Sequence, residues 1–144
     1  MGSSMSDELL YVGVDVGGTK IQASLVRESG DVVARLKGPT PRVGGGGKVI
    51  VAVERLVKDL LRQQRVTTKD VLAVGIAVPG VVDPDVGRVV ITPNMSLTGI
   101  MVGPRLESRF GLPVAVGNDC NLGAMGENWL GAGRGAESVF GIFV

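Results

Sequence analysis

Hydrophobic and polar residues alternate along the first third of the chain, a pattern typical of half-buried strands. The alternation predicts strands over 11–16, 21–27 and 32–36, with glycine-containing turns at 17–18 and 28–31 between them. Since these turns are short, we expect the three strands to pair antiparallel as a meander.

The hydrophobic period then changes to that of a helix. The segment 38–47 contains two prolines and four consecutive glycines, which predicts a mobile surface loop. Apolar residues recur at helical spacing over 48–64, with charged residues on the opposite side, and predict an amphipathic helix whose charged side faces solvent.

In the second half, short apolar runs alternate with turn signals and a further helical pattern. The continuous run 71–78 predicts a strand covered on both faces. The remaining predictions are short strands at 81–82 and 88–91, a helix that ends over 106–110, a strand at 114–116, a helix over 119–130 and a last strand at 138–144.

Composition narrows the functional classes. With 144 residues, 44% of them hydrophobic and 20% charged, the chain has the make-up of one globular domain. A net charge of +1 gives no electrostatic reason to expect nucleic acid or a membrane surface as a partner. We find no signal peptide and no apolar run long enough for a bilayer, and therefore expect a cytoplasmic protein.

The absence of histidine and the single cysteine, Cys120, exclude several chemistries within this sequence. They rule out an internal disulfide, a histidine-based catalytic triad and a structural zinc site. Aromatic residues make up only 3%, so a stacking platform for nucleic-acid bases is not expected.

The turn between the first two strands is the first candidate for binding chemistry. Gly17, Gly18 and Thr19 would present bare backbone amides and a hydroxyl, which suits a phosphate group. Asp15, at the end of the first strand, could hold a metal ion through water. The segment is neither a Walker A loop nor a Gly-x-Gly-x-x-Gly fingerprint, and an ordinary glycine hairpin is the alternative.

The order of elements resembles an α/β fold, the ribonuclease-H-like half of the actin, hexokinase and Hsp70 superfamily. That resemblance implies a mixed five-stranded sheet flanked by helices, with a second domain absent or only begun. Four motifs, beginning at Asp15, Gly75, Thr92 and Gly117, together resemble the ROK family of repressors, uncharacterised reading frames and sugar kinases, most closely its glucokinase-like branch.

The ROK resemblance implies a catalytic aspartate at Asp119, acting as general base on a sugar hydroxyl. A carboxylate at a strand-to-helix junction is rigidly aimed from the carboxyl end of a sheet, where ligands of such sheets gather. The alternative is that Asp119 only caps the helix that follows.

The same resemblance implies the other site residues. Pro79, Gly80, Asn94 and Asn118 would contact the hexose, and Asn94 and Asn118 offer the paired donors and acceptors that hydroxyls require. Asn94 could instead be a turn residue, and Pro79 with Gly80 a strand terminator.

For the nucleotide, the resemblance implies ATP bound through Gly17, Gly18, Thr19 and Lys20, with Mg²⁺ held by Asp15 through water. Lys20 could also be merely solvated. Glu127 lies about two helical turns beyond Asp119 and is interpreted as structural.

We expect residues 1–8 to be a cloning remnant and tail, 9–134 the amino-terminal kinase domain, and 135–144 the first strand of a truncated second domain. The family's adenosine pocket, sugar-binding histidine and zinc loop would lie beyond residue 144. The chain alone is therefore expected to be inactive, and the full-length protein to be a homo-oligomer.

Two other functions remain open. A sugar-sensing repressor of the same family would need a DNA-binding domain ahead of the first strand, and a non-catalytic module would have no chemical need for Asp15 and Asp119. The hexose and the donor, ATP or polyphosphate, also stay open. Many family glucokinases carry a tryptophan three residues after the position of Asn94, where this chain has Leu97.

Overall fold

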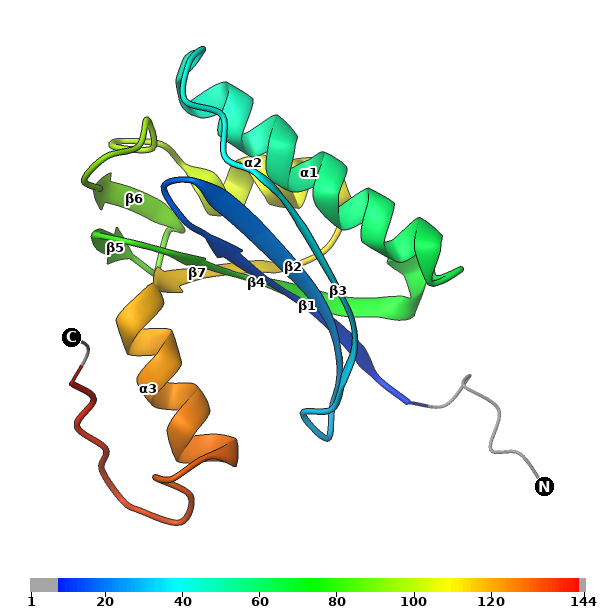
Figure 1. The fold of residues 1–144 in the computed structure, drawn as a ribbon, viewed down its shortest axis with the longest axis vertical. Coiled ribbons are helices and arrows are strands. Elements are labelled where there is room, and N and C mark those ends of the chain that lie inside the picture. The colour runs from blue at the N-terminus through cyan, green and yellow to red at the C-terminus, as the bar shows by residue number, and fades with distance from the viewer. Residues whose placement is uncertain (1–7, 143–144) are drawn as a thin grey trace.

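A five-stranded mixed sheet with helices on both faces forms the fold of the computed structural model, which describes residues 8–142 (Figure 1). The elements in chain order are β1 (Leu10–Val16), β2 (Lys20–Arg27), β3 (Val32–Pro39), α1 (Gly45–Gln63), a short 3₁₀ helix (Thr68–Asp70), β4 (Val71–Val78), β5 (Val81–Asp83), β6 (Arg88–Ile91), α2 (Val102–Phe110), β7 (Val114–Asn118) and α3 (Asp119–Leu130).

The sheet has the strand order β3-β2-β1-β4-β7. Strands β1, β2 and β3 form the predicted antiparallel meander, whereas β4 pairs parallel with both β1 and β7. Strands β5 and β6 form a separate antiparallel pair beyond the end of β4. The mixed five-stranded sheet is therefore the one that the sequence predicted.

Helices α1 and α2 cover one face of the sheet, and α3 lies on the other (Figure 1). The core fills the space under α1 and α2, because alternate residues of each strand point to that face. Its fully buried members include Val12, Val16, Ile21, Leu25, Val49, Val53, Leu60, Ile76 and Leu106. The α3 face is far less covered, and no residue of α3 is fully buried.

The loop predicted over 38–47 is shorter than expected, because three of its four glycines belong to α1. Strand β3 extends to Pro39, and α1 begins at Gly45 rather than Lys48. Gly46 is buried in the first turn of α1, where an added Cβ would lie 2.5 Å from the carbonyl oxygen of Ser96. Close packing against that loop offsets the poor helix propensity of glycine.

The strand predicted at 138–144 is wrong over 138–142, where the chain has no regular secondary structure. A strand needs a hydrogen-bonding neighbour, and no strand of the described residues pairs with this segment. The last two residues lie outside the described part of the chain, as does most of the tail predicted at 1–8.

Two neighbouring glycines of α1 give a matched test of this packing. We expect Gly46→Ala to lower the free energy of unfolding by about 1–3 kcal/mol, because the new methyl would overlap the Ser96 carbonyl and the Ile100 side chain. Gly47→Ala, with nothing within 4 Å of the added Cβ, should be neutral or stabilise by up to about 1 kcal/mol. Urea unfolding measures both, and equal effects of the two substitutions would contradict the packing.

Candidate functional site at the carboxyl edge of the sheet

The three parallel strands end together at one edge of the sheet. In the strand register, Asp15 of β1 lies opposite Ala77 of β4, and Val78 of β4 lies opposite Asn118 of β7. Asp15 and Asn118, which are far apart in the sequence, are therefore only two strands apart at this edge. Ligands of open α/β sheets bind beyond such carboxyl ends.

The carboxylates of Asp15 and Asp119 interact at this edge. Desolvation by surrounding protein atoms, and then the negative charge of Asp119, raise the pKa of Asp15 above its ordinary value. The Asp15 side chain still reaches solvent, and Asp119 is half-buried. Since Val14 and Val16 point into the core beneath α1 and α2, Asp15 points to the α3 face, where Asp119 begins α3.

Asn118, not Asp119, holds the N-cap position of α3. Its Oδ1 accepts a hydrogen bond from the amide of Asn121 at 3.1 Å, and its Nδ2 donates to the carbonyl of Gly80 at 2.6 Å. The alternative that Asp119 is the cap is therefore wrong. The Asp119 carboxylate accepts one bond, from the neighbouring amide of Cys120 at 2.8 Å.

Cys120 follows Asp119 and is exposed. Desolvation and then the Asp119 charge raise the pKa of its thiol above the ordinary value. The thiol is therefore protonated near neutral pH, which is the unreactive form.

Gly80 links this edge to the segment that carries Asn94. Its φ of +100° is one that glycine adopts readily, and an added Cβ would lie 2.2 Å from the carbonyl oxygen of Ile91. The chain from β4 thus passes directly against the end of β6. The strand does end before Pro79, as a terminator would require, and Gly80 also lies against Ile91 and Thr92, which closely precede Asn94.

Asn94 itself has a left-handed backbone, with φ of +59°, which asparagine tolerates better than most residues. Its loop is closed by Thr98, whose hydroxyl accepts a hydrogen bond from the Thr92 amide at 3.1 Å. Asn94 thus lies in the bend after β6, as the turn alternative requires. Because it is also exposed, its side chain is available for a ligand.

The glycine hairpin between β1 and β2 is held from behind by Thr40. The Thr40 hydroxyl donates to the carbonyl of Gly17 at 2.6 Å, and its amide donates to the carbonyl of Thr19 at 2.9 Å. Thr40 is only 5% exposed. Nothing lies within 4 Å of a Cβ added at Gly18, so the hairpin tip is open to a ligand while its base is fixed.

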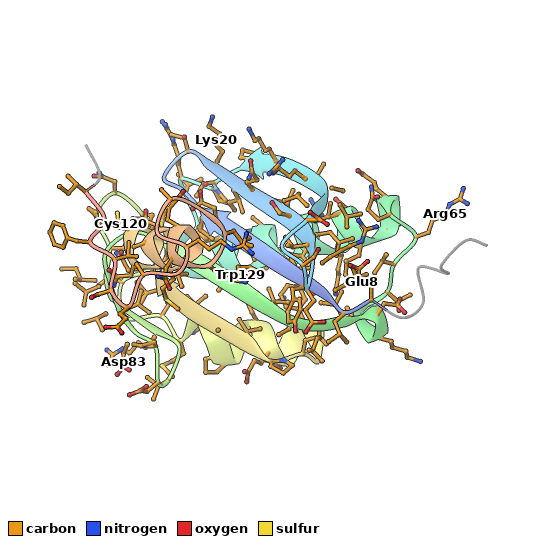
Figure 2. The ribbon with its side chains drawn as sticks, turned by 90° about the horizontal axis from the view of Figure 1, so that it is seen from below. Glu8, Lys20, Arg65, Asp83, Cys120 and Trp129 are labelled. Atoms are coloured by element: carbon orange, nitrogen blue, oxygen red, sulfur yellow. The ribbon has the colours of Figure 1, made fainter. Side chains whose placement is uncertain are left out.

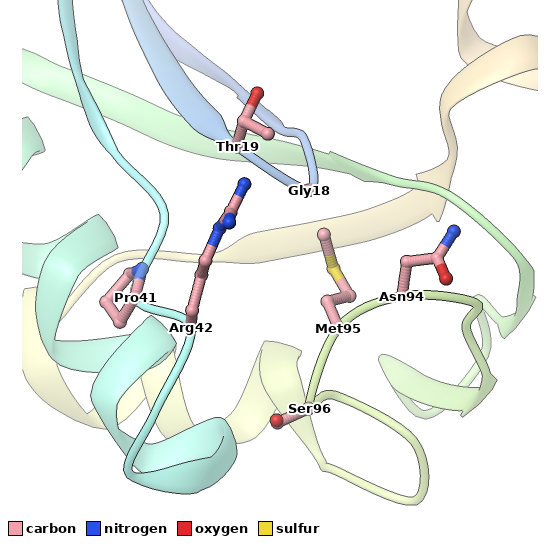
Figure 3. A pocket seen from close by; sticks show the side chains of 7 residues that line it. All are labelled: Gly18, Thr19, Pro41, Arg42, Asn94, Met95 and Ser96. Atoms are coloured by element: carbon pink, nitrogen blue, oxygen red, sulfur yellow. The ribbon is translucent and has the colours of Figure 1, made fainter.

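A cleft of about 690 Å³ adjoins the hairpin tip on the side of α1 and α2 (Figure 3). It is lined by Gly18, Thr19, Pro41, Arg42, Asn94, Met95 and Ser96. Of the residues predicted for the site, this cleft brings together Gly18, Thr19 and Asn94. Asp15, Pro79, Gly80, Asn118 and Asp119 lie outside it, and so do Gly17 and Lys20.

Sequence reasoning missed Thr40 and Arg42. Both lie between β3 and α1, where no hydrophobic period identifies a residue. The position of Thr40 between two prolines could have drawn attention to it, whereas nothing in the sequence around Arg42 marks it as a site residue. Leu97, at the position where many family members have tryptophan, is only 1% exposed and contributes to the core rather than to the cleft.

Glu127 is structural, as interpreted from the sequence. Its carboxylate accepts a hydrogen bond from the Ala132 amide at 3.0 Å, and its carbonyl accepts from the Gly131 amide at 3.0 Å. These bonds close the turn that ends α3. Lys20, by contrast, is exposed beside the hairpin (Figure 2).

The described residues contain no group of three or more histidine, cysteine or acidic side chains that could hold a metal ion. Asp15 and Asp119 are therefore the carboxylates on which a cation site at this edge would depend. No helix within residues 8–142 is long and apolar enough to cross a bilayer.

The fold and the site together define the class. A mixed β3-β2-β1-β4-β7 sheet, with a glycine hairpin and two carboxylates at its carboxyl edge, is a ribonuclease-H-like domain of the actin and hexokinase superfamily. A ROK family glucokinase from Streptomyces griseus, crystallised with glucose and AMPPNP, superposes with a TM-score of 0.78 at 37% identity, over 88% of this chain and 38% of that one.

The chain belongs to the ROK family, whose model matches residues 11–144. A glucokinase from Halalkalibacterium halodurans is 33% identical over 94% of this chain and 41% of its own length. A putative xylose repressor from a Caldicellulosiruptor species is 30% identical over 85% of this chain and 31% of its own. The chain thus spans less than half of these relatives and corresponds to the amino-terminal domain of the glucokinase-like members.

The coupling of the two carboxylates can be tested by titration. We expect Asp119→Asn to lower the pKa of Asp15, because it removes the neighbouring charge, but not to the ordinary value, because desolvation remains. In the wild type, a raised pKa means that the contribution of Asp15 to folding stability is lost as the pH rises through that value. Carboxyl NMR measures the shift, with Asp83→Asn as a control that should leave Asp15 unchanged. An Asp15 pKa that does not change in Asp119→Asn would show that the two carboxylates do not interact.

Proposed function

We propose that this chain is the amino-terminal domain of a sugar kinase that transfers the γ-phosphoryl group of ATP to a hexose hydroxyl, with the 6-hydroxyl of glucose as the first choice. The observation that supports it best is the convergence of Asp119, Asp15 and the glycine hairpin at one edge of the sheet. Phosphoryl transfer needs a base, a phosphate cradle and charge neutralisation close together.

In this mechanism Asp119 accepts the proton of the attacking sugar hydroxyl. Among the described residues, the carboxylate accepts only the bond from the Cys120 amide and is otherwise available for this role, because Asn118 caps α3. The strand-to-helix junction orients Asp119, and the bond from Asn118 to the Gly80 carbonyl ties that junction to β4. A base fixed in this way loses little freedom when the sugar binds.

The hexose hydroxyls are contacted by Asn94, Asn118 and the backbone around Pro79 and Gly80. Asn118 keeps its two structural bonds, so its second N–H and a further lone pair of its oxygen are what it offers a hydroxyl. Asn94 contributes its whole exposed amide.

The amides of Gly18 and Thr19 face the phosphates of ATP, and Lys20 adds a nearby positive charge. Gly17 shapes the hairpin instead of donating to the phosphates, because its amide donates to the Lys20 carbonyl at 2.9 Å. Asp15 would hold Mg²⁺ through water, because its carboxylate reaches solvent and Mg²⁺ keeps several of its waters when it binds to protein. When bound, Mg²⁺ neutralises charge on the phosphate oxygens.

A sugar-sensing repressor is the second candidate, favoured by the 30% identity to a putative xylose repressor. The two functions differ in chemistry, since a sensor needs the sugar contacts but not a base. Phosphoryl transfer by the full-length protein distinguishes them. We further propose a cytoplasmic location, ATP rather than polyphosphate as donor, and a homo-oligomeric full-length protein.

Substitution of the base tests the proposal. In the full-length protein we expect Asp119→Asn to reduce kcat for glucose by about 10² to 10⁴, the usual contribution of a general base. The KM for glucose should change far less, because the amide keeps similar hydrogen-bonding atoms. A coupled assay over a panel of hexoses measures both, with Asp83→Asn as a control of equal charge change. An Asp119→Asn enzyme of wild-type kcat would remove the base assignment.

Residues 1–144 alone are expected to show no kinase activity, since more than half of the length of the curated relatives lies outside the match. The same coupled assay, run on the isolated chain beside the full-length protein, measures this. Glucose phosphorylation by the isolated chain at a rate near that of the full-length protein would contradict it.

A further inference from the structure

Arg42 lies in the cleft at the hairpin tip, and the proposed chemistry has so far given it no role. Figure 3 shows its guanidinium directed from the loop after β3 toward Thr19, with Gly18 beside it. The residues that line the cleft include no carboxylate, so nothing there neutralises the charge. Within residues 8–142, Arg42 forms neither an ion pair nor a side-chain hydrogen bond.

Three arginines of the described chain form ion pairs, and Arg42 is one of those that do not. Arg27 pairs with Glu8, Arg62 with Asp59, and Arg109 with Glu54. Of these pairs, Arg109–Glu54 joins α2 to α1, whereas Arg62–Asp59 lies within α1. Arg42 is exposed and forms no ion pair, but it lines the cleft that also contains Gly18 and Thr19 of the hairpin.

The backbone that carries Arg42 is coupled directly to the hairpin. Pro39, the last residue of β3, pairs with Lys20, and Thr40 bonds to the carbonyls of Gly17 and Thr19. Pro41 then restricts the backbone immediately before Arg42. Strand pairing and two short bonds therefore set the backbone that carries Arg42 close to the hairpin amides, and the exposed Arg42 side chain reaches the hairpin tip from there.

We propose that Arg42 is a phosphate-binding residue, and that its guanidinium together with the open amides at Gly18 and Thr19 forms one oxyanion site on the α1 side of the hairpin. The inference rests on the proposed kinase function and extends it by a residue. A guanidinium presents a planar fork of N–H donors that matches two phosphate oxygens, a geometry that an ammonium group lacks.

The location also has an electrostatic consequence. Without bound Mg²⁺, the carboxylates of Asp15 and Asp119 on the α3 face repel a polyanion, whereas Arg42 lies across the hairpin among residues without negative charge. An anionic ligand at the hairpin tip would thus be attracted from one side and repelled from the other. Attraction toward Arg42 would draw the phosphate chain over the hairpin.

The phosphate could belong to the donor nucleotide or to the phosphorylated sugar, and kinetics separates the two. In the full-length enzyme we expect Arg42→Gln to raise the KM for ATP about tenfold or more, with the KM for glucose unchanged and Arg42→Lys recovering only part of the loss. If the phosphorylated sugar is the ligand, product inhibition by glucose 6-phosphate weakens by a similar factor instead. Either result supports the site.

Arg65→Gln is the matched control, because Arg65 is exposed at the far end of the molecule (Figure 2). It should leave both constants at the wild-type value. Thermal unfolding of Arg42→Gln should also match the wild type, since no bond of the described chain is lost. An Arg42→Gln enzyme whose ATP and product constants equal those of Arg65→Gln would overturn the inference. A wild type inactive on every hexose would instead count against the kinase function.

In that event inorganic tripolyphosphate is the direct probe. Calorimetric titration of the wild-type full-length protein should show binding that Arg42→Gln weakens about tenfold and Arg65→Gln does not. Equal affinity in all three proteins would refute an oxyanion site at Arg42 whatever the reaction is.

Discussion

The parallel pairing of β4 with β1 on one side and β7 on the other is the constraint on which the rest of the structure depends. It sets Asp15, the end of β4 and Asn118 at one edge of the sheet. Parallel strands need long crossovers, and here α1 and α2 supply them while they bury the apolar side of the strands. The site is thus a consequence of packing: the helices that close the core also align the strand ends.

Short polar contacts convert that alignment into a defined edge. Asn118 caps α3 and bonds to the Gly80 carbonyl, and Thr40 holds the base of the hairpin. Gly80 allows the chain to pass against the end of β6, which no larger side chain would permit. Because these contacts hold the edge together, the Asp119 carboxylate and the hairpin tip at Gly18 have little structural role and remain available to a ligand.

The sequence predicted the elements whose hydrophobic period is long and regular. The meander of β1 to β3 and the apolar side of α1 follow from alternation and from helical spacing, and both were found. The errors arose where tertiary contacts outweigh local preference. Gly46 lies within a helix despite its low helix propensity, because the loop packed against it has room only for glycine. The segment 138–142 is irregular because no strand of the described residues lies beside it.

For the site, motifs at the ends of strands could be identified, but not the residues that support them. The sequence could not decide whether Asn118 or Asp119 caps α3, and the hydrogen bonds of the structure assign the cap to Asn118. Arg42 and Thr40 lie in a loop without a period, so their proximity to the hairpin depends on how β3 pairs with β2. Such proximity is a property of strand register, which a single sequence specifies poorly.

The most direct measurement is a crystal structure of the full-length protein with glucose and a non-hydrolysable ATP analogue. The account predicts an Asp119 carboxylate oxygen within hydrogen-bonding distance, about 2.6–3.2 Å, of the hydroxyl that faces the terminal phosphate, with that phosphate at the hairpin tip. Glucose bound away from the β7–α3 junction, or phosphates remote from Gly18, would contradict it.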